Sequence, residues 1–258
     1  MILYVAMAVV LSAGVVAALA PRSASGHPVR WVGFDGQSVL LIFALYVAAE
    51  TFFGTGFAIS LLTACALNEA GHVLAHRMLG RGASHFRLVP LLSEVPVQSD
   101  PFRDEGQAFF VALMGAGFSL APMVLSFGLS AAFQPYAPEI SAMLFLFGGT
   151  VALVNLLSLL PFRMLSGGRC AEIAARNFWP ALAPGMAAFM IAASASAGLR
   201  YMSLPLLGLS LFGLVSLFWS PVSRLRPMGP AVGLLALAAY IMTLTAHFAG
   251  AYLLFGPE

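Results

Sequence analysis

The chain contains no lysine, few charged residues of either sign and only two cysteines. Charged residues make up 9% of the sequence, whereas about 25% is usual for a soluble globular protein. Because 60% of the 258 residues are hydrophobic, a soluble fold of this length has no means of burying them all. The scarcity of charge therefore argues against a soluble domain and predicts an integral membrane protein.

The same absences narrow the choice of partners. The arginines are scattered and form no dense basic patch, so we expect no nucleic-acid partner. The apolar composition makes the lipid bilayer an expected partner. Two cysteines, Cys65 and Cys170, are too few for a disulfide scaffold. Both lie in or beside apolar runs, where cysteine is typically a small packing residue.

Long apolar runs indicate an all-α, polytopic helical membrane protein with about eight transmembrane helices. The runs lie near residues 2–20, 38–54, 55–78, 107–133, 141–160, 181–197, 202–219 and 231–255. The second and third runs are almost continuous, and the glycines around residues 54–56 predict a tight turn between two passes. Residues 18–20 also resemble a signal-peptidase site, but no basic residue precedes the first run, which favours a retained pass.

The arginines assign an orientation to these passes. With eight passes, eleven of the twelve arginines fall in linkers on one side of the membrane, and Arg200 falls on the other. Because positive residues concentrate in cytoplasmic loops, we expect the arginine-rich side to be cytoplasmic and both termini to lie outside. The membrane expected is the cytoplasmic membrane of a bacterium.

The first polar segment, residues 68–76, lies late in the third pass, near its cytoplasmic end. Helical spacing places Glu69, His72 and His76 on one face, with Asn68 close to it. Ionisable groups inside a span are costly and usually mark a function, which favours a functional role for Glu69. Snorkelling toward the membrane interface explains His76, which stands at the helix end.

The second polar segment, residues 155–169, ends the fifth pass. Asn155 lies in the span, and Pro161 is expected to break the helix. Gly167 and Gly168 permit tight backbone geometry. Irregular backbone at membrane depth is tolerated only where protein or a water-filled cavity surrounds it. An ordinary helix end with a proline and glycine stop is the simpler alternative.

Together the two segments resemble the paired motifs of the site-2 protease family, the intramembrane zinc metalloproteases. That family carries His-Glu-x-x-His on one transmembrane helix, and an Asn-x-x-Pro-like segment followed by Leu-Asp-Gly-Gly on a later one. Here residues 68–72 read Asn-Glu-Ala-Gly-His and residues 165–168 read Leu-Ser-Gly-Gly. Between them, residues 86–90 and 94–97 resemble the family's interfacial hairpin, and residues 115–117 stand where its next helix usually carries a Gly-Pro pair.

The resemblance implies a domain organisation. A site-2-protease-like core is expected over residues 55–178, flanked by N-terminal passes over 1–54 and C-terminal passes over 179–258. It also implies that the region of the second motif positions an extended substrate, which points to Asn155, Pro161, Gly167 and Gly168.

In an intact family site, two histidines and one aspartate hold Zn²⁺, and the glutamate polarises a bound water. Glu69 and His72 match this pattern, but Asn68 replaces the first histidine and Ser166 replaces the aspartate. An amide and a hydroxyl are poor zinc ligands, so we expect no zinc and no proteolysis. The open alternative is a rescued zinc site, in which His76 or a cysteine joins His72.

The leading functional hypothesis is a pseudoprotease that binds a transmembrane segment of an unknown membrane protein without cutting it. One alternative is an active intramembrane zinc metalloendopeptidase with an altered metal site. Another is a transporter with Glu50, Glu69 and His72 on an ion path, although no internal inverted repeat supports it. Arg200 and His247, the polar exceptions in the last passes, are interpreted as interfacial or packing residues.

Overall fold

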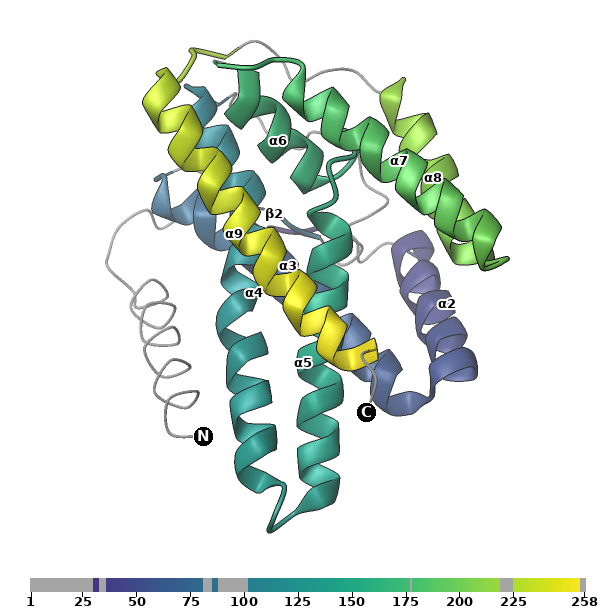
Figure 1. The fold of residues 1–258 in the computed structure, drawn as a ribbon. Helices are drawn as coiled ribbons and strands as arrows, with labels where there is room; N and C mark the ends of the chain where they lie inside the picture. Colours follow the sequence, from purple (N-terminus) through teal and green to yellow (C-terminus); the bar gives the residue numbers. More distant parts are fainter. Residues whose placement is uncertain are drawn as a thin grey trace. The chain divides into compact units, whose positions relative to one another are not determined.

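The computed structural model describes residues 30–32, 36–80, 85–87, 102–176, 178–218 and 225–255. These residues are predominantly helical, which confirms the predicted class, and they include two three-residue strands, β1 (Arg30–Val32) and β2 (His85–Arg87). The helices, labelled in Figure 1, are α2 (Gly36–Phe53), α3 (Thr55–Met78), α4 (Glu105–Phe133), α5 (Pro138–Ser158), α6 (Ser166–Arg176), α7 (Leu182–Arg200), α8 (Leu204–Leu217) and α9 (Pro230–Phe255).

Five of these helices are long and apolar enough to cross a membrane: α3, α4, α5, α7 and α9. Two further apolar helices, α2 over Val39–Phe53 and α8, are shorter. The first expected pass, residues 2–20, lies outside the described residues. Where eight passes were expected, the described chain therefore supplies five helices of full spanning length, which is enough for a multi-pass membrane protein.

The predicted tight turn between the second and third passes is confirmed. Helix α2 ends at Phe53 and α3 begins at Thr55, with Gly54 between them at a φ of +86°, a region that favours glycine. The Gly54 amide donates to the Glu50 carbonyl at 2.9 Å, and Thr55 Oγ1 donates to Glu50 Oε1 at 3.0 Å. Glu50 thus serves to close the turn.

The strand predicted at residues 86–90 is described over His85–Arg87. It pairs in parallel with β1, with Trp31 opposite Phe86. The other half of the expected interfacial hairpin, residues 94–97, lies outside the described residues.

The chain forms two compact units. The first comprises Met1–Pro101, Met114–Leu156 and Thr245–Glu258, and the second comprises Phe102–Leu113 and Leu157–Leu244. The core of the first unit contains Ala64, Met123, Val151, Ala152 and Ala251. In the second unit, α6 packs against α7 and α7 against α8, around a cluster of Leu160, Phe162 and Ala187.

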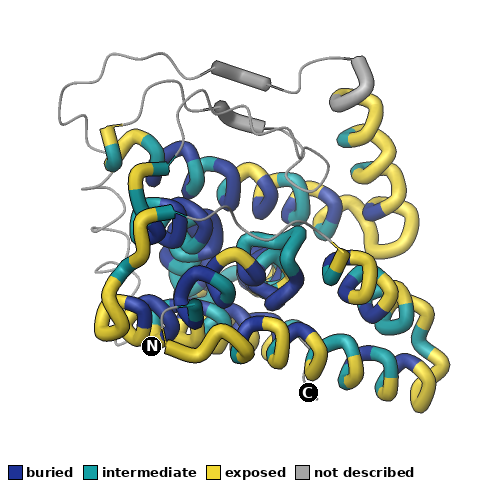
Figure 2. The backbone as a smooth tube through the Cα atoms, turned by 90° about the horizontal axis from the view of Figure 1, so that it is seen from above, coloured by how far each residue is buried: buried dark blue, intermediate teal, exposed yellow. Residues whose placement is uncertain are grey.

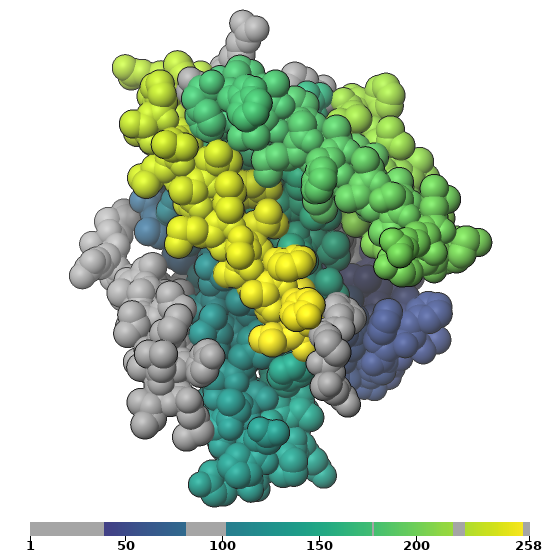
Figure 3. Space-filling view, in the orientation of Figure 1, coloured from purple at the N-terminus to yellow at the C-terminus, as the bar shows by residue number. Residues whose placement is uncertain are grey.

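The helices bury one side and expose the other. Figure 2 shows dark-blue buried positions and yellow exposed positions alternating around them. Many exposed side chains are large and hydrophobic, among them Phe189 on α7, Leu211 on α8 and Met242 on α9. The side chains of α9, yellow in Figure 3, are open to view along the helix. Such extensive apolar surface is typical of helices that face lipid.

Candidate functional site

The first polar segment is helical throughout and belongs to the first unit. Helix α3 carries Asn68 and Glu69 on its buried side, with exposed fractions of 5% and 6%. His72 and His76 are half-buried, and Arg77 after them is exposed. A carboxyl group is rarely buried inside a membrane helix unless it interacts with other protein groups, so Glu69 belongs to the interior of the bundle.

A close approach of α3 to α4 positions His72. A Cβ added at Gly71 would overlap the Met114 carbonyl oxygen on α4, and one added at Gly115 would lie 2.5 Å from His72 Nε2. Small residues facing each other allow two membrane helices to pack this closely. His72 therefore lies directly against the α4 backbone at Gly115, within the segment where the family resemblance had placed a glycine-containing pair.

Asn68 and Asn155, one from each polar segment, are in direct contact. Asn68 Nδ2 donates to Asn155 Oδ1 at 2.8 Å, and Asn155 Nδ2 donates to the Val151 carbonyl of its own helix at 2.8 Å. Asn155 is fully buried. Asn68 Oδ1 lies 3.0 Å from the position that a Cβ at Gly115 would take. The structure thus joins two of the predicted residues through a buried amide pair.

The second polar segment shows the predicted helix break. Helix α5 ends at Ser158 and α6 begins at Ser166, with Pro161 in the turn between them. A Cβ at Gly167 would overlap the Leu159 carbonyl, and one at Gly168 would overlap the Phe162 carbonyl. Close packing of the turn therefore accounts for both glycines, whatever else they do.

Two positions that hold zinc in the family carry neutral side chains here, Asn68 and Ser166. Among the residues that the structure describes, no group of three or more His, Cys, Asp and Glu side chains could hold a metal ion. Asn68 commits an amide N–H to Asn155, and Ser166 offers only a hydroxyl. Burial raises the pKa of the Cys170 thiol.

His247 is a buried polar residue that sequence reasoning interpreted only as interfacial or packing. Its side chain is fully buried, and its Nε2 lies 3.0 Å from the Ala116 carbonyl oxygen on α4. Its Nδ1 has no hydrogen-bond partner among the described residues. A lone histidine deep in an apolar run was the available signal, but nothing local indicated which helix it contacts.

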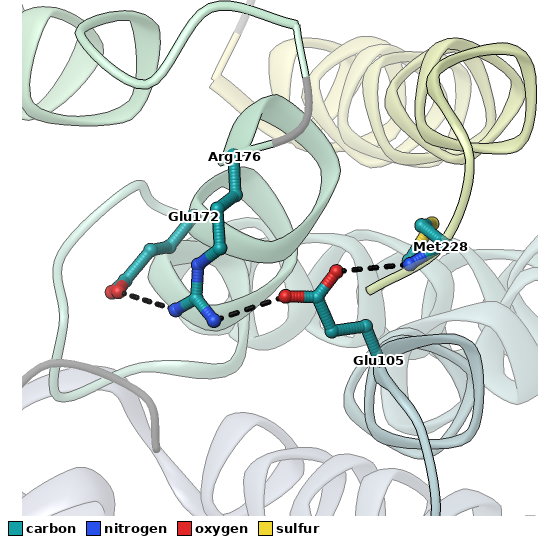
Figure 4. Close-up of polar contacts among 4 residues, drawn as sticks. All are labelled: Glu105, Glu172, Arg176 and Met228. Atoms are coloured by element: carbon teal, nitrogen blue, oxygen red, sulfur yellow. Dashed lines mark hydrogen bonds and ion pairs between the residues drawn. The ribbon is translucent and has the colours of Figure 1, made fainter. Parts of the chain in front are cut away.

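An ionic cluster in the second unit was also missed. Glu105, 1% exposed, accepts hydrogen bonds from Arg176 Nη1 at 3.0 Å and from the Met228 amide at 3.2 Å. Arg176 lies between Glu105 and Glu172, and its Nη2 donates to Glu172 Oε1 at 3.0 Å (Figure 4). The cluster ties the start of α4 to α6 and to the segment that precedes α9.

The predicted site residues are thus distributed over both units. Those in the first unit are Asn68, Glu69, His72, His76 and Asn155, and those in the second are Pro161, Ser166, Gly167 and Gly168. Comparisons of the chain with models of protein families, with curated proteins and with solved structures find no match.

Proposed function

We propose that this protein is a non-catalytic membrane protein with a site-2-protease-like core, which holds a transmembrane segment of a partner protein without cutting it. The observation that carries the proposal is the 2.8 Å hydrogen bond from Asn68 Nδ2 to Asn155 Oδ1. Each residue comes from one of the two segments that resemble the family's motifs. At position 68, where the family has a zinc-binding histidine, this chain has an asparagine that forms a neutral amide pair with Asn155 inside the first unit.

The amide pair argues against hydrolysis. Peptide hydrolysis by a metalloprotease requires a metal that lowers the pKa of its bound water to about 7. Asn68 carries no charge to stabilise a cation, and its Nδ2 already donates to Asn155 Oδ1. Glu69 then has no metal-bound water to activate, so its position matches the family's base without serving as one.

Retention of polar groups in the span supports a binding role. Buried polar groups in a membrane are expensive, so residues of this kind usually contribute to a function. Asn68 Oδ1, directed to the Gly115 side of α3, is an acceptor of the kind that a locally unwound helix requires for its amide N–H groups. A partner helix with such a break would find its hydrogen bonds at this site.

The proposal includes the full topology of eight passes with a cytoplasmic arginine-rich side. Helix α2 has 18 residues and extends about 27 Å, close to the roughly 30 Å of a bilayer core. Helix α8 has 14 residues and extends about 21 Å, so local bilayer thinning or its flanking residues must complete that pass. The uneven distribution of arginine supports the orientation.

Two measurements on the purified full chain test the proposal. Metal analysis is expected to find no stoichiometric zinc in the unmodified protein, and zinc in the Asn68→His, Ser166→Asp double variant. Stoichiometric zinc in the unmodified protein that disappears with His72→Ala would overturn the non-catalytic assignment.

A photoreactive residue at position 68 is expected to crosslink a protein partner in the membrane, whereas one at exposed Val232 serves as the control. Crosslinks to lipid alone at position 68 would overturn the binding role.

A further inference from the structure

The second unit contains a partly open cavity of about 150 Å³ between the turn after α5, helix α6 and the start of α7. Its lining includes Pro161, Arg163, Glu172, Arg176 and Ala183. Pockets for drug-sized ligands measure roughly 300–1,000 Å³, whereas a cavity of about 150 Å³ accommodates a group the size of benzene. The space therefore suits one small head group.

The charged side chains favour an anion in this cavity. Arg163 Nη1 donates to the Leu217 carbonyl at 3.1 Å, and no carboxylate forms an ion pair with Arg163 among the described residues. A guanidinium has five N–H donors, so the bond to Leu217 leaves donors for an oxyanion. Arg176 is shared between Glu105 and Glu172 (Figure 4). Of these two carboxylates, Glu172 lines the cavity. Arg163 is therefore the lining cation that no carboxylate of the described residues neutralises.

The position of the cavity along the chain points to the membrane interface. Helix α6 has 11 residues, too few to span, and it buries one face while Arg169 is exposed on another. The cavity lies beside this helix at the end of α5 and the beginning of α7, where spanning helices meet the head-group region. Basic pockets at such positions on the cytoplasmic side of membrane proteins bind acidic lipid head groups.

We propose that this cavity binds the phosphate of an anionic phospholipid head group, with Arg163 as the principal contact. A planar guanidinium matches two phosphate oxygens with two parallel hydrogen bonds, which a lysine does not. A soluble phosphate monoester shares this chemistry but has no acyl chains to place against the apolar helix surfaces. The site rests on the orientation given under the proposed function, but not on the role of the Asn68–Asn155 pair.

The test is native mass spectrometry of the full chain, released from nanodiscs of phosphatidylcholine with or without phosphatidylglycerol. The unmodified protein is expected to retain phosphatidylglycerol, and Arg163→Gln to bind it about tenfold more weakly, the loss of about one charge-assisted hydrogen bond. Arg163→Lys is expected to fall between them. The matched control, Arg200→Gln, removes one exposed arginine outside the cavity and should bind as the unmodified protein does.

A second variant tests the cavity without changing its charge. Ala183→Phe fills the space beside the arginines and is expected to abolish retention, even if Arg163→Gln fails to fold. Equal retention by the unmodified protein and Ala183→Phe would overturn the proposal, as would an equal loss in Arg200→Gln. Competition by millimolar glycerol phosphate supports the phosphate site, whereas binding of glycerol phosphate with no retention of phosphatidylglycerol overturns the lipid as its source.

Discussion

Asn68 and Asn155 stand 87 positions apart in the sequence, yet their side-chain amides meet at 2.8 Å in the interior of the first unit. Asn155 is held in place by its own helix, because its Nδ2 donates to Val151. Asn68 is held by the close packing of α3 on α4 at Gly71. The amide pair therefore joins α3 and α5 without any metal, and its energetic role can be measured directly.

A double-mutant cycle is expected to find coupling between Asn68 and Asn155. Asn155→Ala leaves the Asn68 amide without this partner, and Asn68→Ala removes the same bond from the other side. Side-chain hydrogen bonds between membrane helices average about 0.6 kcal/mol and reach about 1.7 kcal/mol, so a favourable coupling of about 0.6–1.7 kcal/mol is expected. The measurement is reversible unfolding by SDS in mixed micelles. Additive single-variant effects would contradict the bond, and Ser196→Ala is the control, because Ser196 is exposed on α7.

Local rules explain the parts of the fold that the sequence predicted. The turn at Gly54 and the helix break near Pro161 depend on residues with restricted or unusual backbone preferences, which act within a few positions. Length and apolarity likewise predicted the helices α3, α4, α5, α7 and α9. The apolar run at residues 202–219 also predicted α8, but the helix covers only Leu204–Leu217, because apolar composition alone does not show where a helix ends.

The sequence did not predict which side chains of different helices are in contact. Asn68 and Asn155 were recognised as polar residues in apolar runs, but their contact depends on how α3, α4 and α5 pack. Glu105 and Arg176 lie 71 positions apart, and neither has a neighbour in the sequence that indicates the pair. His247 contacts Ala116 across 131 positions. Such contacts follow from tertiary packing, which hydrophobic periodicity does not specify.

Gly71→Ala is expected to destabilise the first unit. The added methyl group would overlap the Met114 carbonyl, and backbone atoms cannot move aside as a flexible side chain can. Overpacking of this kind costs about 1–3 kcal/mol, and SDS-induced unfolding would measure it. Gly208→Ala on α8 is the matched control, because nothing lies within 4 Å of its added Cβ. It should be neutral or slightly stabilising, so equal losses in the two variants would contradict the α3–α4 contact.

Glu105→Ala is expected to cost more stability than Glu172→Ala, although both carboxylates bind Arg176. Glu105 is 1% exposed and also accepts the Met228 amide, so its removal takes one partner from each of two donors, at a cost of about 1–3 kcal/mol. Glu172 is 20% exposed and forms an i,i+4 pair, which is worth about 0.3–0.5 kcal/mol. Thermal unfolding in detergent measures the difference. Similar effects of the two variants would show that the buried cluster does not anchor α4 to α6.

Tyr240→Phe is expected to weaken the turn after α5. Tyr240 Oη donates to the Leu159 carbonyl at 2.7 Å, and both residues are fully buried. That carbonyl follows the last residue of α5, where helical backbone groups have no intrahelical partner, so losing the phenol leaves it unsatisfied. A loss of about 1–2 kcal/mol is expected in SDS-induced unfolding. Tyr252→Phe is the control, because Tyr252 is 59% exposed on the same helix and should change stability little. Gly167 packs against the same Leu159 carbonyl, so Gly167→Ala should also destabilise the turn. Unchanged stability in both Tyr240→Phe and Gly167→Ala would contradict the geometry of the turn.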